Sequence, residues 1–110
     1  MRLENHLGII ADPATIESLG PAVNELTDVD EAYVILSADA EQYVQAAGTV
    51  EEDFIFERRD GCAGEHYRGD RRVSADELVV MLEGYLRGAP DWSHGLSWHQ
   101  VDVDEDAPRA

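Results

Sequence analysis

The pattern of apolar and polar positions predicts an amphipathic helix over residues 74–87. Apolar residues recur there at helical spacing along one face, at Leu78, Val79, Met81, Leu82, Tyr85 and Leu86. Ser74 and Glu77 have the spacing of a capping box, in which the serine hydroxyl accepts from the glutamate amide and the glutamate reaches back. Gly88 supplies a left-handed stop, and Pro90 prevents the helix from restarting.

An earlier segment predicts a second, less regular helix. Asp12 followed by Pro13 is typical of a helix N-cap and the first helical position. The apolar face of this helix consists of Ile16, Leu19, Val23 and Leu26. Gly20-Pro21 interrupts the pattern, so we expect either a broken helix or a short one that restarts at Pro21. The acidic run Asp28, Asp30 and Glu31 ends it.

Four segments between the helices predict strands, namely residues 32–36, 42–47, 53–59 and 65–68. The third segment alternates most clearly. Phe54 and Phe56 are expected to face the core, with Ile55, Glu57 and Arg59 on the opposite surface.

Short turns join these strands, and the loop that begins at Asp60-Gly61 closes a hairpin between the third and fourth segments. Residues 96–103 predict a final strand, bulged near His99-Gln100 where the alternation slips. Residues 104–110 are charged and are expected to be a frayed tail.

The predicted fold is a single α+β domain over residues 1–110, with element order α-β-β-β-β-α-β. Strands joined by short turns favour an antiparallel sheet of about five strands with helices packed on one face. A parallel sheet would need crossover helices between successive strands, and the chain leaves no room for them.

The charge balance restricts the kinds of partner that this chain can bind. It has 24 acidic and 8 basic residues, a formal net charge of −16, and every basic residue is an arginine. A strong negative field repels nucleic acid and membrane surfaces and attracts basic proteins. The composition of a GC-rich bacterial genome or of a salt-adapted proteome also explains this acidity.

Other features of the composition indicate a cytoplasmic protein. The first ten residues contain no apolar run long enough for a signal peptide, and no later stretch approaches the length of a membrane span. The single cysteine, Cys62, cannot form an internal disulfide, which agrees with a reducing compartment.

The candidate chemistry is sparse, and we expect no catalytic residues, cofactor or metal. Cys62 and His66 are four residues apart, but the cysteine lies in a loop and the histidine on a predicted strand. His94 and His99 are a single loose pair, whereas zinc sites place paired ligands at two points of the chain. The acidic runs lack the spacing of a calcium loop and are interpreted as solvated charge.

The two tryptophans are expected to pack against the helix over residues 74–87. For Trp92, which lies in the loop after that helix, an exposed contact with a partner is the alternative, because tryptophan is enriched at binding hot spots.

Several segments together resemble a known family, namely residues 54–61, 65–68, 73–88 and 91–98. They contain a strand ending in Asp-Gly, a polar-aromatic strand, the capped helix, Trp92 in a loop and a closing strand with Trp98. This arrangement resembles small immunity proteins of bacterial polymorphic toxin systems, of the α+β type with a C-terminal tryptophan often paired with deaminase-like toxins. One departure is His99, where that pattern has an acidic residue.

The resemblance implies a non-enzymatic protein that inhibits a cognate toxin by occluding its active or substrate-binding surface. The expected partner is a basic toxin domain, and neither nucleic acid nor a membrane is expected to bind. The expected contact residues are Glu57, Arg59, Glu65, Arg68 and Trp92. The alternatives are a housekeeping or assembly protein without catalysis and a small enzyme that uses Cys62 and His66.

Overall fold

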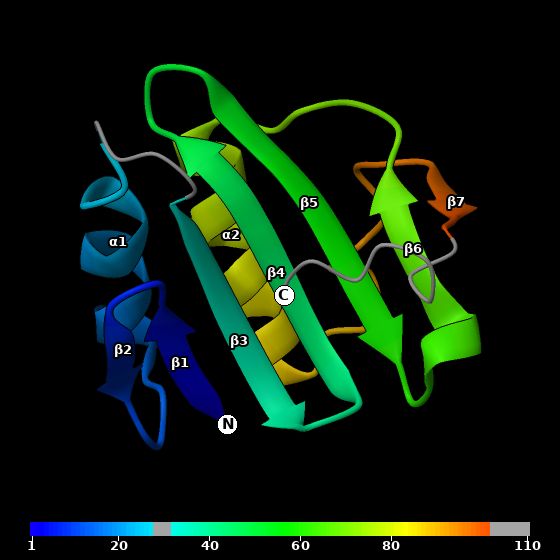
Figure 1. Ribbon diagram of the computed structural model, residues 1–110, viewed down its shortest axis with the longest axis horizontal. Helices are drawn as coiled ribbons and strands as arrows, with labels where there is room; N and C mark the ends of the chain where they lie inside the picture. The colour runs from blue at the N-terminus through cyan, green and yellow to red at the C-terminus, as the bar shows by residue number, and fades with distance from the viewer. Residues whose placement is uncertain (28–31, 102–110) are drawn as a thin grey trace.

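The computed structural model describes residues 1–27 and 32–101, which form one α+β unit built on a seven-stranded sheet (Figure 1). Every neighbouring pair of strands is antiparallel. In chain order the strands are β1 (Arg2–Asn5), β2 (Gly8–Ala11), β3 (Tyr33–Asp39), β4 (Gln42–Thr49), β5 (Asp53–Asp60), β6 (His66–Gly69) and β7 (Trp98–Gln100). Their order across the sheet is β2-β1-β3-β4-β5-β6-β7, so β2 and β7 are the two edges.

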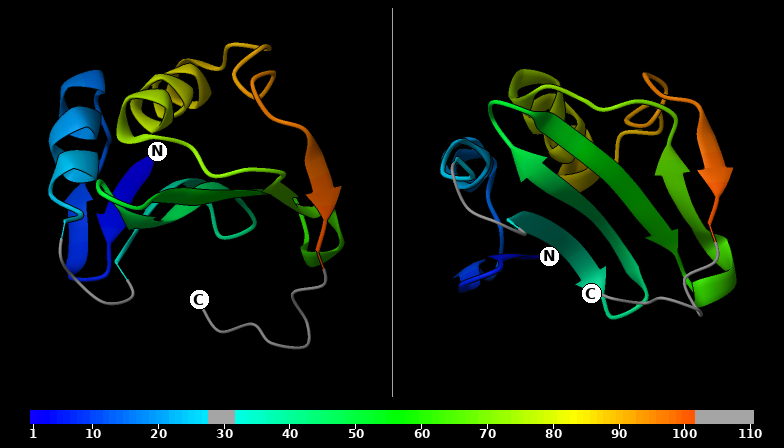
Figure 2. Two further views of the ribbon diagram at one scale, coloured as in Figure 1. Left: turned by 90° about the horizontal axis from the view of Figure 1, so that it is seen from above. Right: turned by 45° about the horizontal axis from the view of Figure 1, so that its top comes forward.

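Both helices, α1 (Ile16–Asn24) and α2 (Ala75–Arg87), cover the same face of the sheet (Figure 2). They also pack against each other. The core lies between them and the sheet, and its largest side chains include Leu3, Leu19, Leu36, Phe54, Phe56, Leu78 and Leu82. This layer structure confirms the predicted class, an antiparallel sheet with helices on one face.

The α2 helix has the predicted start and end. Ser74 Oγ accepts from the Glu77 amide at 3.2 Å, and the Ser74 amide donates to Glu77 Oε1 at 3.1 Å. Gly88 has φ = 74°, a left-handed conformation that costs glycine nothing. The predicted apolar stripe is the face that packs on the sheet, with Leu78 and Leu82 almost fully buried.

The alternation in β5 is confirmed as well. Phe54 and Phe56 are buried beneath the helices, while Ile55, Glu57 and Arg59 lie on the opposite face of the sheet. The β5 and β6 strands form the predicted antiparallel hairpin, and a short 3₁₀ turn, η1 (Ala63–Glu65), lies between them.

The N-terminal prediction was wrong in two respects. Residues 2–5 and 8–11 are strands, so the sheet has seven strands rather than about five. Asp12-Pro13 belongs to the connection after β2, with a cis peptide bond, and α1 begins at Ile16 after Thr15. These two strands form because β1 pairs with β3 and β2 pairs with β1. The residues of β1 and β2 alone do not indicate which strands they pair with.

The expected break at Gly20-Pro21 was also wrong, because α1 runs through it without interruption. Pro21 has no N–H to donate to the Glu17 carbonyl, which weakens the helix locally. Gly20 has no Cβ to clash with the proline ring, so the usual restriction on the residue before proline is relieved. Burial of Leu19 and Val23 holds this helix on the sheet.

The remaining strands differ from the predictions in their ends. The β3 strand continues to Asp39 through residues expected to form a turn, and β4 passes Gly48 to Thr49. The β7 strand is shorter than the predicted 96–103. The predicted positions of the acidic run at 28–31, of the end of the last strand and of the frayed tail lie outside the described residues.

Among the described residues, no helix is both long enough and apolar enough to cross a membrane.

Candidate functional site

A connected polar network lies on the face of the sheet opposite the helices, which we call the open face. Two cross-strand rows of β4, β5 and β6 build it. In one row Glu57 pairs with Gln45 on one side and with Arg68 on the other, and in the next row Arg59 pairs with Tyr43 and with His66. The antiparallel register therefore gathers six side chains that are up to 25 positions apart in the chain, Tyr43 to Arg68.

Glu57 is the centre of this network. Its Oε2 accepts from Arg68 Nε at 2.8 Å and lies 2.7 Å from Arg68 Nη2. Its Oε1 lies 2.7 Å from His66 Nε2 and accepts from Gln45 Nε2 at 3.2 Å. Both carboxylate oxygens therefore have hydrogen-bond partners within the protein. These partners replace the water that a residue only 9 % exposed cannot reach.

These contacts set the ionisation of Glu57. Burial by itself would raise the pKa of this carboxyl group, but the hydrogen bonds from His66 and Arg68 favour the charged form more strongly, and the pKa lies below its ordinary value. Glu57 therefore carries a full negative charge near neutral pH, and that charge is held by two partners.

The hydrogen bonds of His66 define its tautomer. Arg59 Nε, which can only donate, lies 3.2 Å from His66 Nδ1, so this ring nitrogen must be the acceptor. The proton then resides on Nε2 and is donated to Glu57 Oε1. His66 is 2 % exposed, so both hydrogen bonds lie out of contact with solvent.

Arg59 connects the buried part of the network to the surface. Its Nη1 donates to Glu41 Oε1 at 2.9 Å, and its guanidinium lies 5.4 Å from the Tyr43 ring centroid. The Tyr43 ring also meets His66 edge-on, with 6.1 Å between the ring centroids. The open face thus presents fixed charges in a defined order, rather than long side chains that move freely in water.

The geometry of His66 bears on the Cys62–His66 pair considered from the sequence. Both ring nitrogens of His66 are engaged, with Arg59 and with Glu57, so neither is free in this arrangement to accept a proton from a thiol. Cys62 lies in the exposed loop before η1.

A second cluster, on the helix side of the sheet, is aromatic. Trp92 contacts Tyr85 of α2, Phe56 and Trp98, at ring centroid distances of 5.0, 6.1 and 5.9 Å. The guanidinium of Arg58 lies over Trp98 at 4.8 Å from the ring centroid and is 3.3 Å from Asp60 Oδ2. These contacts give Trp92 a structural role, because they hold the loop after α2 against the sheet.

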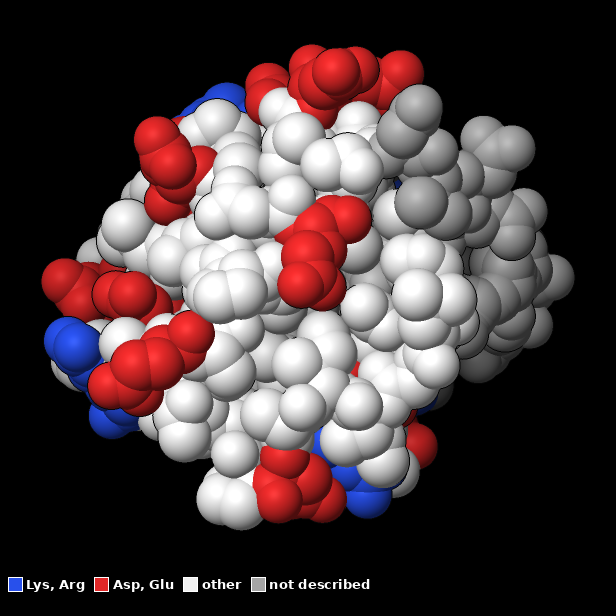
Figure 3. Space-filling view, turned by 90° about the vertical axis from the view of Figure 1, so that its left-hand side faces the viewer, with Lys and Arg blue, Asp and Glu red and all other residues white. Residues whose placement is uncertain are grey.

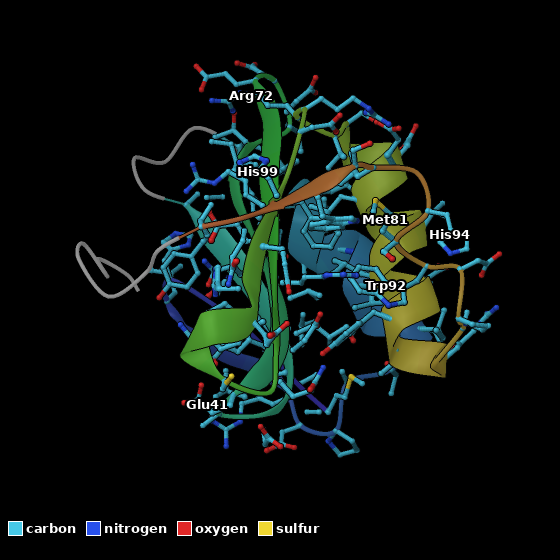
Figure 4. The ribbon with its side chains drawn as sticks, turned by 90° about the vertical axis from the view of Figure 1, so that its right-hand side faces the viewer. Glu41, Arg72, Met81, Trp92, His94 and His99 are labelled. Atoms are coloured by element: carbon cyan, nitrogen blue, oxygen red, sulfur yellow. The ribbon has the colours of Figure 1, made fainter. Side chains whose placement is uncertain are left out.

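The structure brings together only part of the predicted contact set. Glu65 is the last residue of η1, just before β6, and is exposed; it accepts from Tyr67 Oη, and the Tyr67 ring lies with Arg58 on the helix side of the sheet. The other three charged residues, Glu57, Arg59 and Arg68, are adjacent on the open face. Trp92 is on the other side of the sheet. Figure 4 shows Trp92 next to α2, whereas His99, the cross-strand neighbour of Arg68, lies away from α2.

The same view separates the two histidines that were considered as metal ligands, because His94 lies on the outer side of the α2 layer and His99 does not (Figure 4). Within residues 1–27 and 32–101, no group of three or more His, Cys, Asp or Glu side chains has the arrangement of a metal site.

Sequence reasoning missed His66 as the partner of Glu57. The residues are nine apart, and only the register of the β5–β6 hairpin, which pairs Glu57 with Arg68 and Arg59 with His66, places them on neighbouring rows. The alternation of β5 had already assigned Glu57 and Arg59 to this face.

Comparisons with protein-family models, curated proteins and solved structures found no match to this chain.

Proposed function

We propose that this protein is a non-enzymatic, acidic binding protein of the cytoplasm, an immunity protein that inhibits a cognate basic toxin by covering its active or substrate-binding surface. The proposal combines the resemblance described above with the distribution of charge in the folded chain.

The observation that carries the proposal is the internal pairing of the arginines. Arg2, Arg58, Arg59, Arg68 and Arg71 each have a nitrogen between 2.7 and 3.6 Å from a carboxylate oxygen of this same chain. These five cations therefore offset carboxylates within the molecule and do not present isolated positive charge to a partner. With a formal net charge of −16, the surplus of carboxylates sets the field outside the protein.

Such a field favours one class of partner. A negatively charged protein attracts a basic surface at long range and accelerates its docking, whereas it repels phosphate backbones. A toxin that acts on nucleic acid has a basic substrate-binding surface, which is the complement of this protein.

The open face supplies the proposed contact surface, with Glu57, Arg59 and Arg68 at its centre. The ion pairs hold these side chains in place before binding, so less conformational entropy is lost on association. Trp92 supports the fold from the other side of the sheet and has no part in this surface.

Co-expression tests the proposal. The chain should restore the growth of cells that express the product of the adjacent toxin gene, and the two proteins should co-purify. The association rate constant, measured by stopped flow, should fall as NaCl increases from 0.05 to 0.3 M, roughly, because salt screens the attraction.

A matched pair of variants separates charge from fold. Glu51→Lys with Glu52→Lys changes two exposed residues of the β4–β5 loop and should slow association. Glu51→Asp with Glu52→Asp preserves the charge and should leave the rate unchanged. Failure of both growth rescue and co-purification would contradict the proposal. Enzymatic turnover of a substrate that depends on Cys62 or His66 would also contradict it.

A further inference from the structure

Exposed apolar side chains gather at one edge of the sheet. Leu7, Ile9 and Ile10 are 84, 60 and 39 % exposed, and all three belong to the β1–β2 hairpin. Single exposed apolar residues are ordinary, but a group of them on one short hairpin marks an interaction site. In the rest of the described chain, the exposed large apolar residues are Met1, which precedes β1 and is 37 % exposed, and Val80 of α2, which is 67 % exposed.

The edge strand itself is open to a further strand. The β2 strand pairs with β1 on one side and is the last strand of the sheet on the other. Its sequence, Gly8-Ile9-Ile10-Ala11, contains none of the charges or prolines with which proteins protect their sheet edges. The strand at the opposite edge, β7, exposes His99 and Gln100 instead.

The surroundings of β2 are acidic. Residues 1–27 contain Glu4, Asp12, Glu17 and Glu25 but a single arginine, Arg2, which lies 3.6 Å from Asp12. Glu4 is the direct cross-strand neighbour of Ile9. Figure 3 shows this side of the molecule, a largely uncharged surface with acidic side chains around and within it and a few basic side chains at its margin.

This charge pattern selects the occupant. A second copy of this chain would bring the same acidic margin and a net charge of −16 toward itself, which disfavours pairing of β2 with β2. An extended segment that carries both apolar residues and lysine or arginine satisfies both features, since its apolar side chains cover the exposed isoleucines and its basic side chains meet the surrounding carboxylates.

We propose that β2 is a docking edge to which such an apolar-basic segment of a partner protein adds as a further strand of the sheet. The inference rests on the proposed binding function and assigns it a second point of contact, distinct from the polar network of the open face.

Two synthetic peptides test this assignment without a known partner. One is an acetylated octapeptide that alternates valine and lysine, and the other alternates valine and glutamate. With the ¹⁵N-labelled full chain, the lysine peptide should shift the backbone amide resonances of Gly8–Ala11 and slow their hydrogen exchange. The glutamate peptide should do neither.

Two lysine variants localise the effect. Ile9→Lys should weaken binding of the lysine peptide by about tenfold, because it removes apolar contact area and one side of the charge match. Val80→Lys adds the same charge on α2 and should leave the affinity within about twofold. Equal melting temperatures of the two variants confirm that the fold is intact.

The remaining outcomes overturn the assignment. Shifts outside β1 and β2, equal weakening by both variants, or dimerisation of the chain through β2 would each do so. If growth rescue and complex formation persist in the Ile9→Lys protein, the docking edge is wrong while the proposed function stands. If rescue fails in the unmodified protein, the proposed function itself is wrong.

Discussion

At the scale of single residues, the environment of Glu57 differs from that of the other carboxylates. Most acidic side chains within residues 1–27 and 32–101 are exposed, but Glu57 lies within the sheet face with His66, Arg68 and Gln45 on its two oxygens. Hydrogen bonds to a charged group are about twice as strong as neutral ones. Removing the charge at one member therefore affects every partner in the network.

Glu57→Gln should lower the free energy of unfolding at pH 7 by about 1–3 kcal/mol, because Arg68 loses its charged acceptor and His66 and Gln45 lose part of theirs. Urea denaturation measures the effect. Glu51→Gln, at an exposed carboxylate, is the control and should change stability by less than about 0.5 kcal/mol. Equal effects of the two substitutions would show that the network contributes nothing beyond ordinary surface charge.

The pH dependence of this difference follows from the lowered pKa of Glu57. Its unfolded value is near 4.5 and its folded value is lower, so the contribution is complete above the unfolded value. It is then lost progressively as the pH falls below 4.5 toward and through the folded value. The gap between the wild-type and Glu57→Gln proteins should therefore shrink progressively in urea titrations as the pH is lowered from roughly 5.

At the scale of elements, the two helices show how far local sequence decides structure. The residues at the two ends of α2 determine where it begins and ends, since the capping box at Ser74 and the left-handed Gly88 both occur as predicted. The α1 helix depends on its surroundings, because Pro21 lies in its interior and burial against the sheet keeps it continuous.

The cap of α2 provides a test at this scale. Ser74→Ala should lower the free energy of unfolding by about 1 kcal/mol, since the amide at Glu77 loses its acceptor. Ser74→Gly should cost only a few tenths of a kcal/mol, because glycine leaves that amide accessible to water. Thermal denaturation of both variants would show the difference, and equal melting temperatures would mean that the cap bond is not the stabilising feature.

Strands β1 and β2 are the elements that the sequence did not predict. Each has four residues, and of their large apolar side chains only Leu3 is buried. Alternation over so few positions is too weak to identify a strand, and the hydrogen bonds that stabilise β1 come from β3, about thirty residues away. Their pairing is a property of the folded sheet.

At the scale of the whole molecule, net charge and size act together. The described chain spans 31 × 30 × 25 Å. At about 10 mM salt the Debye length is about 30 Å, so each carboxylate interacts with charges across the entire protein. At about 150 mM it is about 8 Å, and only neighbouring charges interact.

Raising NaCl from about 10 to 150 mM should therefore stabilise the fold, because screening removes more repulsion than attraction in a chain with a net charge of −16. A gain of about 1 kcal/mol corresponds to a rise in melting temperature of about 4 °C for a domain of this length. Scanning calorimetry at several salt concentrations measures it. A falling melting temperature would mean that the ion pairs outweigh the general repulsion.

The sequence by itself determined the elements whose causes are local. The capped α2 helix, the alternation of β5 and the hairpin turn after it follow from residues within one or two turns of each other. The sequence also determined the sign of the field around the molecule, since a sum of charges does not depend on the fold.

Tertiary structure alone decided the features that join distant parts of the chain. It placed β1 and β2 at the sheet edge, carried α1 through Pro21 and set the His66–Glu57 bond through the hairpin register. It also placed Trp92 on the helix side of the sheet, opposite the open face, because the ring is more stable among Tyr85, Phe56 and Trp98 than in water. Each of these outcomes depends on which surfaces are buried together, and local periodicity contains no information about the partner surface.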